Sequence, residues 1–473
     1  MNCVSAWTYA ITVITMATSI ASVATAQSDD AAPDQESSAN AASDQKSSGD
    51  ATPVQQGVLP IPDYAGDLSS RSTLLGDLNG ARTSLAEHGI QFGVDWSTTL
   101  QSVVTGGRDT GAELGTALDY NFKFDLMRMN LIPGGLVEMK VESRFGESVN
   151  GNTGGLLPVS SDLMFPLTSP LDENVPVTIT NLKYSQFFSD KFGVFVGKFD
   201  TLNGDPNEFA SGRGVTQFQD LNLVFSPALL VTAPYSTLGG GAFYAPNKYI
   251  TATASVFATA DSSTTTGFET LDEGLTFNGE INFQYRIGKL PGGFNVGGSY
   301  AWDNNFATIG RRFTFHPGVG LTPTPDENTS WAAYGSAWQY LIAHEDEGET
   351  SGPLNSTNGI PDLRGIGVFG RIGFADPGTN PIDFAVSAGI GGKGLIPGRG
   401  NDVFGVGYYY TSIQTRRLTS ALGLRDSIQG VEAFYNIAVT PATGLTLSAQ
   451  VVEPVTDNLD TAVVLGARLL LRF

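Results

Sequence analysis

Residues that could carry out chemistry are scarce in this sequence. Its 473 residues include one cysteine, Cys3, and three histidines, His88, His316 and His344. A single thiol excludes a disulfide scaffold and any site in which several cysteines bind zinc or an iron–sulfur cluster. His344 lacks the second histidine of a zinc-binding helix, and no G-x-S-x-G nucleophile motif is present. We therefore predict no metal, no cofactor and no catalytic residue.

One glycine motif fits a nucleotide-binding pattern by spacing alone. Gly389, Gly391 and Gly394 match G-x-G-x-x-G, which binds phosphate only when the glycines open a helix. Pro397 and Gly398 follow and favour a turn. The formal net charge of -21 also excludes a nucleic-acid partner, because phosphate binding needs an excess of Lys and Arg.

The elements that must position any functional side chain are strands. From residue 90 onward the sequence alternates between apolar and polar residues, most regularly over residues 118–126 and 275–287. Such a strand has one apolar and one hydrophilic face. A soluble β-sandwich also alternates. However, these segments reach about ten residues, the length of a tilted strand that crosses a bilayer. Short turns also alternate with long polar loops, which is typical of outer-membrane barrels.

Counting all such segments gives seventeen strands. Strict alternation of short and long connections removes residues 217–225, so that sixteen remain with both ends of the barrel domain on the short-turn side. The connection at 344–363 is long for a turn, and that at 376–381 is short for a loop. The predicted fold is all-β: a transmembrane antiparallel β-barrel of about 16 strands, with a short N-terminal helix and an inward-folded loop.

The N-terminal region divides into three predicted segments. Residues 1–26 have an apolar core that ends in Ala24-Thr25-Ala26, as in a secretory signal peptide; the alternative is an uncleaved membrane anchor. Residues 27–66 contain a near-duplicate, AAPDQESS and AASDQKSS, and are interpreted as a disordered acidic linker. Apolar residues at helical spacing predict a short amphipathic helix over residues 67–89. Residues 90–473 form the barrel domain.

The last strand is the most specific single signal. Every odd position from 463 to 473 is apolar, and the sequence closes on Phe473. A final amphipathic strand that ends in Phe resembles the signal by which outer-membrane barrels are recognised by their assembly machinery.

Four segments near the end resemble the carbohydrate-selective outer-membrane porins of the OprB family. They are GVFGRIGFADPGTNPIDF, SAGIGGKGLIPGRGNDVFGVGYYY, QGVEAFYNIAVTP and DTAVVLGARLLLRF. The opening HGIQFG is also similar, and the resemblance covers residues 74–473. It implies a 16-stranded porin in the outer membrane of a Gram-negative bacterium, usually a homotrimer, which passes mono- and small oligosaccharides by passive diffusion.

Inward-facing charges and one long loop are the candidate pore-lining residues. Thr201 to Ser236 is predicted to fold inward as a constriction; the alternative is an exposed surface loop. The inward faces offer charges of both signs, which either orient polar solutes in a transverse field or simply pair with strand neighbours. The candidates are Asp119, Lys123, Asp125, Glu138, Lys140, Glu142, Arg144, Asp205, Glu208, Arg213, Glu280, Arg286 and Arg371.

Two other functions are left open by the sequence. One is a general diffusion pore without sugar preference, and the other is an outer-membrane enzyme or adhesin. Because acidic residues are in excess, we expect weak discrimination against anions. Trp302, Trp331 and Trp338 are predicted to lie in the aromatic belts at the membrane interfaces.

Overall fold

The computed structural model describes residues 57–163, 177–201, 206–309, 313–316, 320–323, 326–344, 361, 363–414 and 423–473. The predicted signal peptide, residues 27–56 and Asp205 lie outside them. The described helices are short: α2 (Ala81–Glu87), α3 (Leu221–Val224) and 3-10 turns at Ser161–Leu163, Gly212–Gly214, Pro227–Leu229 and Phe268–Thr270. None of the helices in this part of the chain has the length and apolar character needed to cross a membrane.

Sixteen of the described strands close into one antiparallel barrel, as the sequence predicts. Each pairs with the next along the chain, β9 pairs with β12, and β18 pairs with β1 to close the cylinder. The strands are β1 (Ile90–Thr105), β2 (Gly111–Asp125), β3 (Gly135–Gly146), β4 (Thr178–Phe187), β5 (Phe192–Asp200), β6 (Ser236–Asn247), β7 (Ile250–Ala258), β8 (Leu275–Ile287), β9 (Leu290–Phe306), β12 (Glu327–His344), β13 (Arg364–Ala375), β14 (Phe384–Lys393), β15 (Val403–Ser412), β16 (Ser427–Thr440), β17 (Thr443–Val452) and β18 (Ala462–Arg472). β10 (Phe313–His316) and β11 (Gly320–Pro323) form a separate two-stranded sheet.

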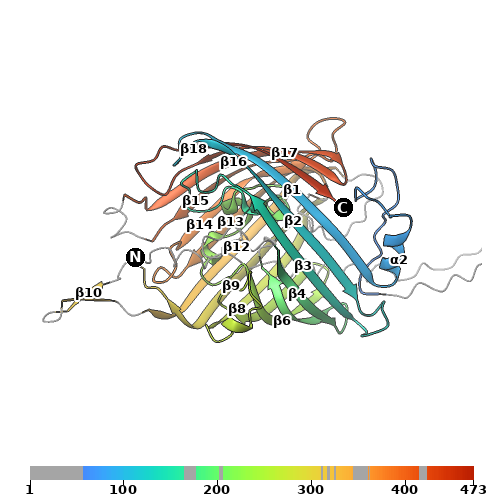
Figure 1. Cartoon of the computed structure of the whole chain (residues 1–473), viewed down its shortest axis with the longest axis horizontal. Coiled ribbons are helices and arrows are strands. Elements are labelled where there is room, and N and C mark those ends of the chain that lie inside the picture. Colours follow the sequence, from blue (N-terminus) through green and yellow to red (C-terminus); the bar gives the residue numbers. More distant parts are fainter. Residues whose placement is uncertain are drawn as a thin grey trace, which may run out of the picture.

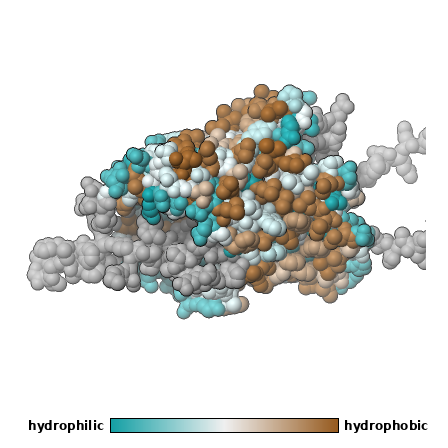
Figure 2. Space-filling model, turned by 45° about the horizontal axis from the view of Figure 1, so that its top comes forward, coloured by the Kyte–Doolittle hydropathy of each residue, from teal (hydrophilic) through white to brown (hydrophobic). Residues whose placement is uncertain are grey.

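Alternation along the strands decides which face meets lipid. On β8, Phe277 and Ile281 are exposed on the outer wall, whereas Asn278 and Glu280 are buried on the inner one. Figure 2 shows a mainly apolar wall with hydrophilic residues toward its ends. Closing the barrel sheet pairs its edge strands, so every strand of the barrel has hydrogen-bonding neighbours on both sides, which a lipid environment requires.

The two ends of the barrel differ in their connections. At one end, which we call the turn end, β8 and β9 are separated by two residues and α2 lies near the C-terminus (Figure 1). At the opposite loop end, a long segment joins β5 to β6. Both irregular connections fit this alternation: β12 to β13 lies at the turn end and β13 to β14 at the loop end.

Residues 206–235, which we call the inner loop, occupy the inside of the barrel. The segment that the prediction removed from the strand count forms α3 here. The Phe209 ring packs 4.8 Å from that of Tyr340 on β12, and the Phe218 ring packs 4.8 Å from that of Phe434 on β16, measured between centroids. The inner loop therefore contributes its own apolar core, in contact with the barrel wall.

The prediction for Trp338 is wrong. Trp331 is exposed on the outer wall, but Trp338 is buried on the inward face of β12, 6.3 Å from the Phe209 ring. The reason is the inner loop, which gives inward aromatic side chains an apolar surface to cover. A tryptophan in an alternating strand therefore does not by itself indicate the lipid face.

The N-terminal helix is shorter than the range predicted for it. Leu78, Asn79 and Gly80 have successive φ values of 52°, 60° and 89°, which a right-handed helix cannot contain, so α2 begins at Ala81. Before it, Val58 and Leu59 are buried against Leu136 at the turn end. The predicted linker, residues 27–66, is described from residue 57 onward, and this described part packs on the barrel.

Candidate functional site

Six charged side chains meet on the inner wall where β2, β3 and β5 face the inner loop. Alternation along β3 points Lys140, Glu142 and Arg144 inward, and the register sets Glu142 opposite Asp119 of β2. Asp200 ends β5, and Arg213 comes from the inner loop. We call this set the charged cluster; its members are Asp119, Lys140, Glu142, Arg144, Asp200 and Arg213.

Contacts within the charged cluster pair every cation with more than one carboxylate. Lys140 Nζ lies 3.2 Å from Asp119, 3.0 Å from Glu142 and 2.9 Å from Asp200. Arg144 lies 2.8 Å from Asp119 and 3.2 Å from Glu142. Arg213 lies 2.6 Å from both Glu142 and Asp200. Three cations thus balance three carboxylates, which offsets the large cost of burying either sign alone.

Part of the charged cluster remains accessible. The side chains of Asp119, Lys140 and Arg213 are 15%, 11% and 11% exposed, whereas those of Glu142, Arg144 and Asp200 are fully enclosed or nearly so. The accessible members present both acceptors and donors. A polar solute can therefore meet both signs of charge at one place.

Tyr235 completes the attachment of the inner loop to the charged cluster. Its hydroxyl donates to Glu142 Oε2 at 2.6 Å and contacts Arg213. Burial, reinforced by Glu142 and Asp200, raises the pKa of the Tyr235 hydroxyl well above its usual value. The phenol therefore stays protonated and keeps its donor role.

A second charged set lies on the same wall, nearer the turn end. Glu138 of β3 stands opposite Lys123 of β2 on one side and Lys183 of β4 on the other. Lys183 Nζ is 2.8 Å from Glu138, and Lys123 is exposed. Of the candidates predicted from the sequence, the structure thus gathers Asp119, Lys140, Glu142, Arg144 and Arg213 in one cluster and Lys123 and Glu138 beside it.

The other described candidates lie apart. At the turn end, Asp125 accepts a hydrogen bond from the Leu59 amide at 2.9 Å, and Arg286 donates to the Lys289 carbonyl at 3.2 Å. Glu208 accepts from the Tyr340 hydroxyl at 2.7 Å.

Glu280 and Arg371 are engaged by other parts of the protein. Glu280 accepts from the Tyr334 hydroxyl at 2.8 Å and from Asn295 at 3.2 Å. Arg371 donates to main-chain carbonyls of the inner loop. Phe473 lies at the end of β18, with its ring 6.3 Å from that of Trp96.

Sequence reasoning missed Asp200, Tyr235 and Glu432. Asp200 is the last residue of β5, and Tyr235 is the last residue of the inner loop before β6. Their positions at the two ends of a long connection are a signal that the sequence offers. Glu432 is a single carboxylate at an inward position of β16. A charge that interrupts an otherwise neutral strand could have identified it.

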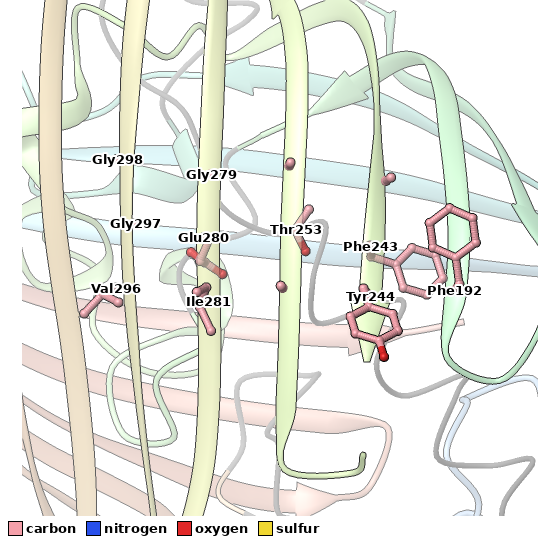
Figure 3. A pocket seen from close by; sticks show the side chains of 13 residues that line it. Phe192, Phe243, Tyr244, Thr253, Gly279, Glu280, Ile281, Val296, Gly297 and Gly298 are labelled. Atoms are coloured by element: carbon pink, nitrogen blue, oxygen red, sulfur yellow. The ribbon is translucent and has the colours of Figure 1, made fainter. Parts of the chain in front are cut away.

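A groove of about 590 Å³ lies on the outer wall across β6 to β9 (Figure 3). Tyr244, Ile281 and Val296 line it and are exposed, and Gly279 and Gly298 leave its floor open. These positions share the outward face; Phe243, Thr253 and Glu280, whose side chains are buried, also line the groove. The groove therefore faces lipid and is separate from the charged cluster.

Among the described residues, no group of three or more His, Cys, Asp or Glu side chains could hold a metal ion. The three carboxylates of the charged cluster are already engaged by lysine and arginine. The closed barrel, its apolar outer wall and its charged interior define a β-barrel channel of the outer-membrane porin class.

Comparison of the sequence with known protein families identifies the family. The model of the carbohydrate-selective porin OprB family matches residues 110–473, and the chain belongs to this family. It is an outer-membrane porin for carbohydrates, with a multi-pass β-barrel, and its family and fold are those of channels. A search of curated proteins found no match.

Solved structures show the same fold. A structure of Pseudomonas putida OprB at high pH is 17% identical and aligns with a TM-score of 0.67 over 86% of this chain and 100% of that one. A low-pH structure of the same protein is 15% identical, with a TM-score of 0.52 over 86% and 99%. At sequence identities this low, the structural similarity is evidence for the fold alone.

Proposed function

We propose that mono- and small oligosaccharides diffuse passively through the barrel past the charged cluster, without a cofactor and without chemical conversion. The observation that carries this proposal is the balance of three cations against three carboxylates, with one carboxylate and two cations partly accessible. A sugar is neutral and carries hydroxyl groups that both donate and accept. A balanced set of charges offers partners for both roles without attracting ions of one sign.

Weak binding is part of the proposal, because a channel must release what it binds. Each charged group in the cluster already has ionic partners at 2.6–3.2 Å. A hydroxyl group must compete with these contacts, so its own hydrogen bonds add little net free energy. The solute is therefore retained only briefly.

Liposome swelling tests this function. We compare the wild-type protein with the double variant Asp119→Asn, Lys140→Gln, which removes one charge of each sign and leaves the net charge unchanged. The matched control is Arg425→Gln, Glu453→Gln, an ion pair of 3.3 Å at the loop end. We expect wild type and control to favour sugars over amino acids of similar size, and the cluster variant to lose this preference.

The outcomes are distinct. Equal swelling with sugars and amino acids for the wild type would show a general diffusion pore. Absence of swelling with a folded barrel would refute the channel. If the cluster variant kept the preference for sugars over amino acids, the contacts that select sugars would lie elsewhere in the lumen.

We further propose that the mature protein is a homotrimer surrounded by outer-membrane lipid, that residues 1–26 are a signal peptide, and that residues 27–66 form a linker whose described end packs on the barrel. The apolar outer wall supports the lipid contact. The position of Phe473 at the end of the closing strand supports recognition by the barrel assembly machinery. Cross-linking in detergent tests the trimer: a single band at the monomer mass would contradict it.

A further inference from the structure

Three buried side chains of the barrel wall contact the main chain of the inner loop. Arg371 of β13 donates to the Leu223 carbonyl at 2.8 Å and to the Ala210 carbonyl at 2.9 Å. One guanidinium group therefore joins two loop positions that are thirteen residues apart in the sequence. The planar fork of arginine suits this contact, because its nitrogens donate in different fixed directions.

Arg468 of β18 makes the same kind of contact from another part of the wall, where four strands separate it from β13. Its guanidinium donates to the carbonyls of Gly214 and Gln217, the latter at 3.2 Å, and to Thr446 at 3.2 Å. Gly214 has a φ of 72°, a conformation that favours glycine. Arg468 thus holds the loop directly beside Arg213, which enters the charged cluster.

Glu432 of β16 supplies the complementary contact. Its carboxylate accepts hydrogen bonds from the Gln219 amide at 2.8 and 3.0 Å and from the Asp220 amide at 2.8 Å. Arginines therefore bind carbonyls of the loop, and a carboxylate binds its amides. Together the three side chains contact six main-chain groups between residues 210 and 223.

Burial separates these residues from the solute route. Glu432, Arg468 and Arg371 are 0%, 1% and 4% exposed. Charges enclosed in this way cannot touch a passing sugar or ion. The hydrogen bonds of the two arginines are charge-assisted, which makes them stronger than neutral ones.

We propose that Arg371, Arg468 and Glu432 are positioning residues that set the width of the channel by fixing the main chain of the inner loop. This inference rests on the proposed channel function and adds a role to it. Because the contacts go to backbone groups, these three wall residues hold the main chain of the loop directly, in addition to the contacts that the loop's own side chains make with the wall. Arg371, which the sequence suggested as pore-lining, acts through the loop.

Conservative substitutions of the three side chains test the proposal. Arg468→Lys and Arg371→Lys retain a cation, but an ammonium group cannot reproduce the arginine fork. Glu432→Gln retains the shape and replaces one of the two accepting carboxyl oxygens with an amide nitrogen. The matched control is Lys123→Gln, which removes an exposed inward charge that lies away from the inner loop.

Single-channel recording in planar bilayers and liposome swelling provide the readouts. We expect each lysine variant to change the conductance by about 1.5-fold or more, to increase current fluctuations and to alter the relative swelling rates of mono- and disaccharides. Its reversal potential should stay that of the wild type. Lys123→Gln should instead shift the reversal potential and keep the steady open level.

Contrary results are equally clear. Wild-type conductance and solute discrimination in both lysine variants would overturn the proposal, as would a shift in reversal potential alone. Folding is checked by heat-modifiable migration. If neither lysine variant nor Glu432→Gln formed the barrel, the three residues would be determinants of folding and the positioning role would be lost. A wild-type protein that conducts nothing would instead refute the proposed function itself.

Discussion

Arg82 of α2 donates a hydrogen bond of 2.9 Å to the carbonyl of Phe473, although 391 positions separate the two residues. The same guanidinium donates to the Phe92 carbonyl on β1 at 2.8 Å, and it lies over the rings of Tyr64 and Phe92. The pairing of β1 with β18 closes the barrel, and we call this junction the seam. Arg82 therefore contacts the chain on both sides of the seam.

Arg82→Ala should therefore destabilise the barrel at its seam. Loss of the two charged hydrogen bonds should cost about 2 to 3 kcal/mol of unfolding free energy, because Arg82 is buried and each of its carbonyl partners loses a charged donor. The measurement is urea unfolding in detergent, followed by heat-modifiable migration. Glu87→Gln, on the exposed side of α2, is the control. Equal midpoints for all three proteins would show that the seam does not depend on Arg82.

Much of the barrel could be predicted from the sequence because a strand pattern is local. Alternation over residues 275–287 corresponds to β8, and the connection rule removed the segment that forms α3. The first inference needs only neighbouring residues, and the second needs the alternation of short turns and long loops along the chain.

The site was only partly predictable because its contacts are distant in sequence. Alternation alone placed Lys140 and Glu142 on one face, but Asp200 joins them through β5, 60 residues after Lys140. The prediction for Trp338 is wrong for the same reason, because its partner Phe209 belongs to a loop that folds back into the barrel. The face of a strand can be inferred locally, whereas the partner on that face is decided by the path of the chain.

Arg213→Ala should alter both the charge of the lumen and the hold on the inner loop. Its loss leaves Asp119, Glu142 and Asp200 with two cations, so one negative charge is uncompensated. We expect a stronger cation preference and a destabilisation of about 3 kcal/mol, since removing one partner of a buried ion pair is costly. Reversal potentials in a salt gradient and urea midpoints measure the two effects. Arg213→Lys should restore the selectivity; if it behaved like the alanine variant, charge would not be the cause.

Asp220 should make stability depend on pH. It lies in the inner loop, and burial raises its pKa to about 6 from an ordinary value of 3.8. The folded state therefore keeps this proton over a range in which the unfolded state has lost it. Consequently the stability falls as pH rises from about 4 to about 6, by roughly 3 kcal/mol in total, and is constant above that range.

Asp220→Asn isolates the effect of this carboxyl group. The amide oxygen can still accept from the Asn222 amide, which Asp220 binds at 2.9 Å. Urea midpoints between pH 4 and pH 7 should fall for the wild type relative to this variant. Asp63→Asn, at an exposed site outside the barrel, should retain the wild-type slope. Parallel curves for wild type and Asp220→Asn would rule out titration of Asp220 as the source.

Exposed carboxylates at the loop end should give the channel its weak discrimination against anions. Glu269, Asp272 and Glu273 are exposed in one connection, between β7 and β8, with no lysine or arginine in that segment. Such a set creates a negative potential that concentrates cations at the mouth, and salt screens it. The triple variant Glu269→Gln, Asp272→Asn, Glu273→Gln should therefore reduce the cation preference at low salt and match the wild type near 1 M.

The control for this prediction removes the same number of charges from the opposite end. Asp63→Asn, Glu87→Gln and Asp190→Asn are exposed substitutions at the turn end, away from the loop-end mouth. If position matters, this control should keep the selectivity of the wild type when the salt gradient is applied from the loop end. If both triple variants lose cation preference equally, the effect comes from the net charge of the protein. In that case the carboxylates between β7 and β8 have no special part in selecting ions.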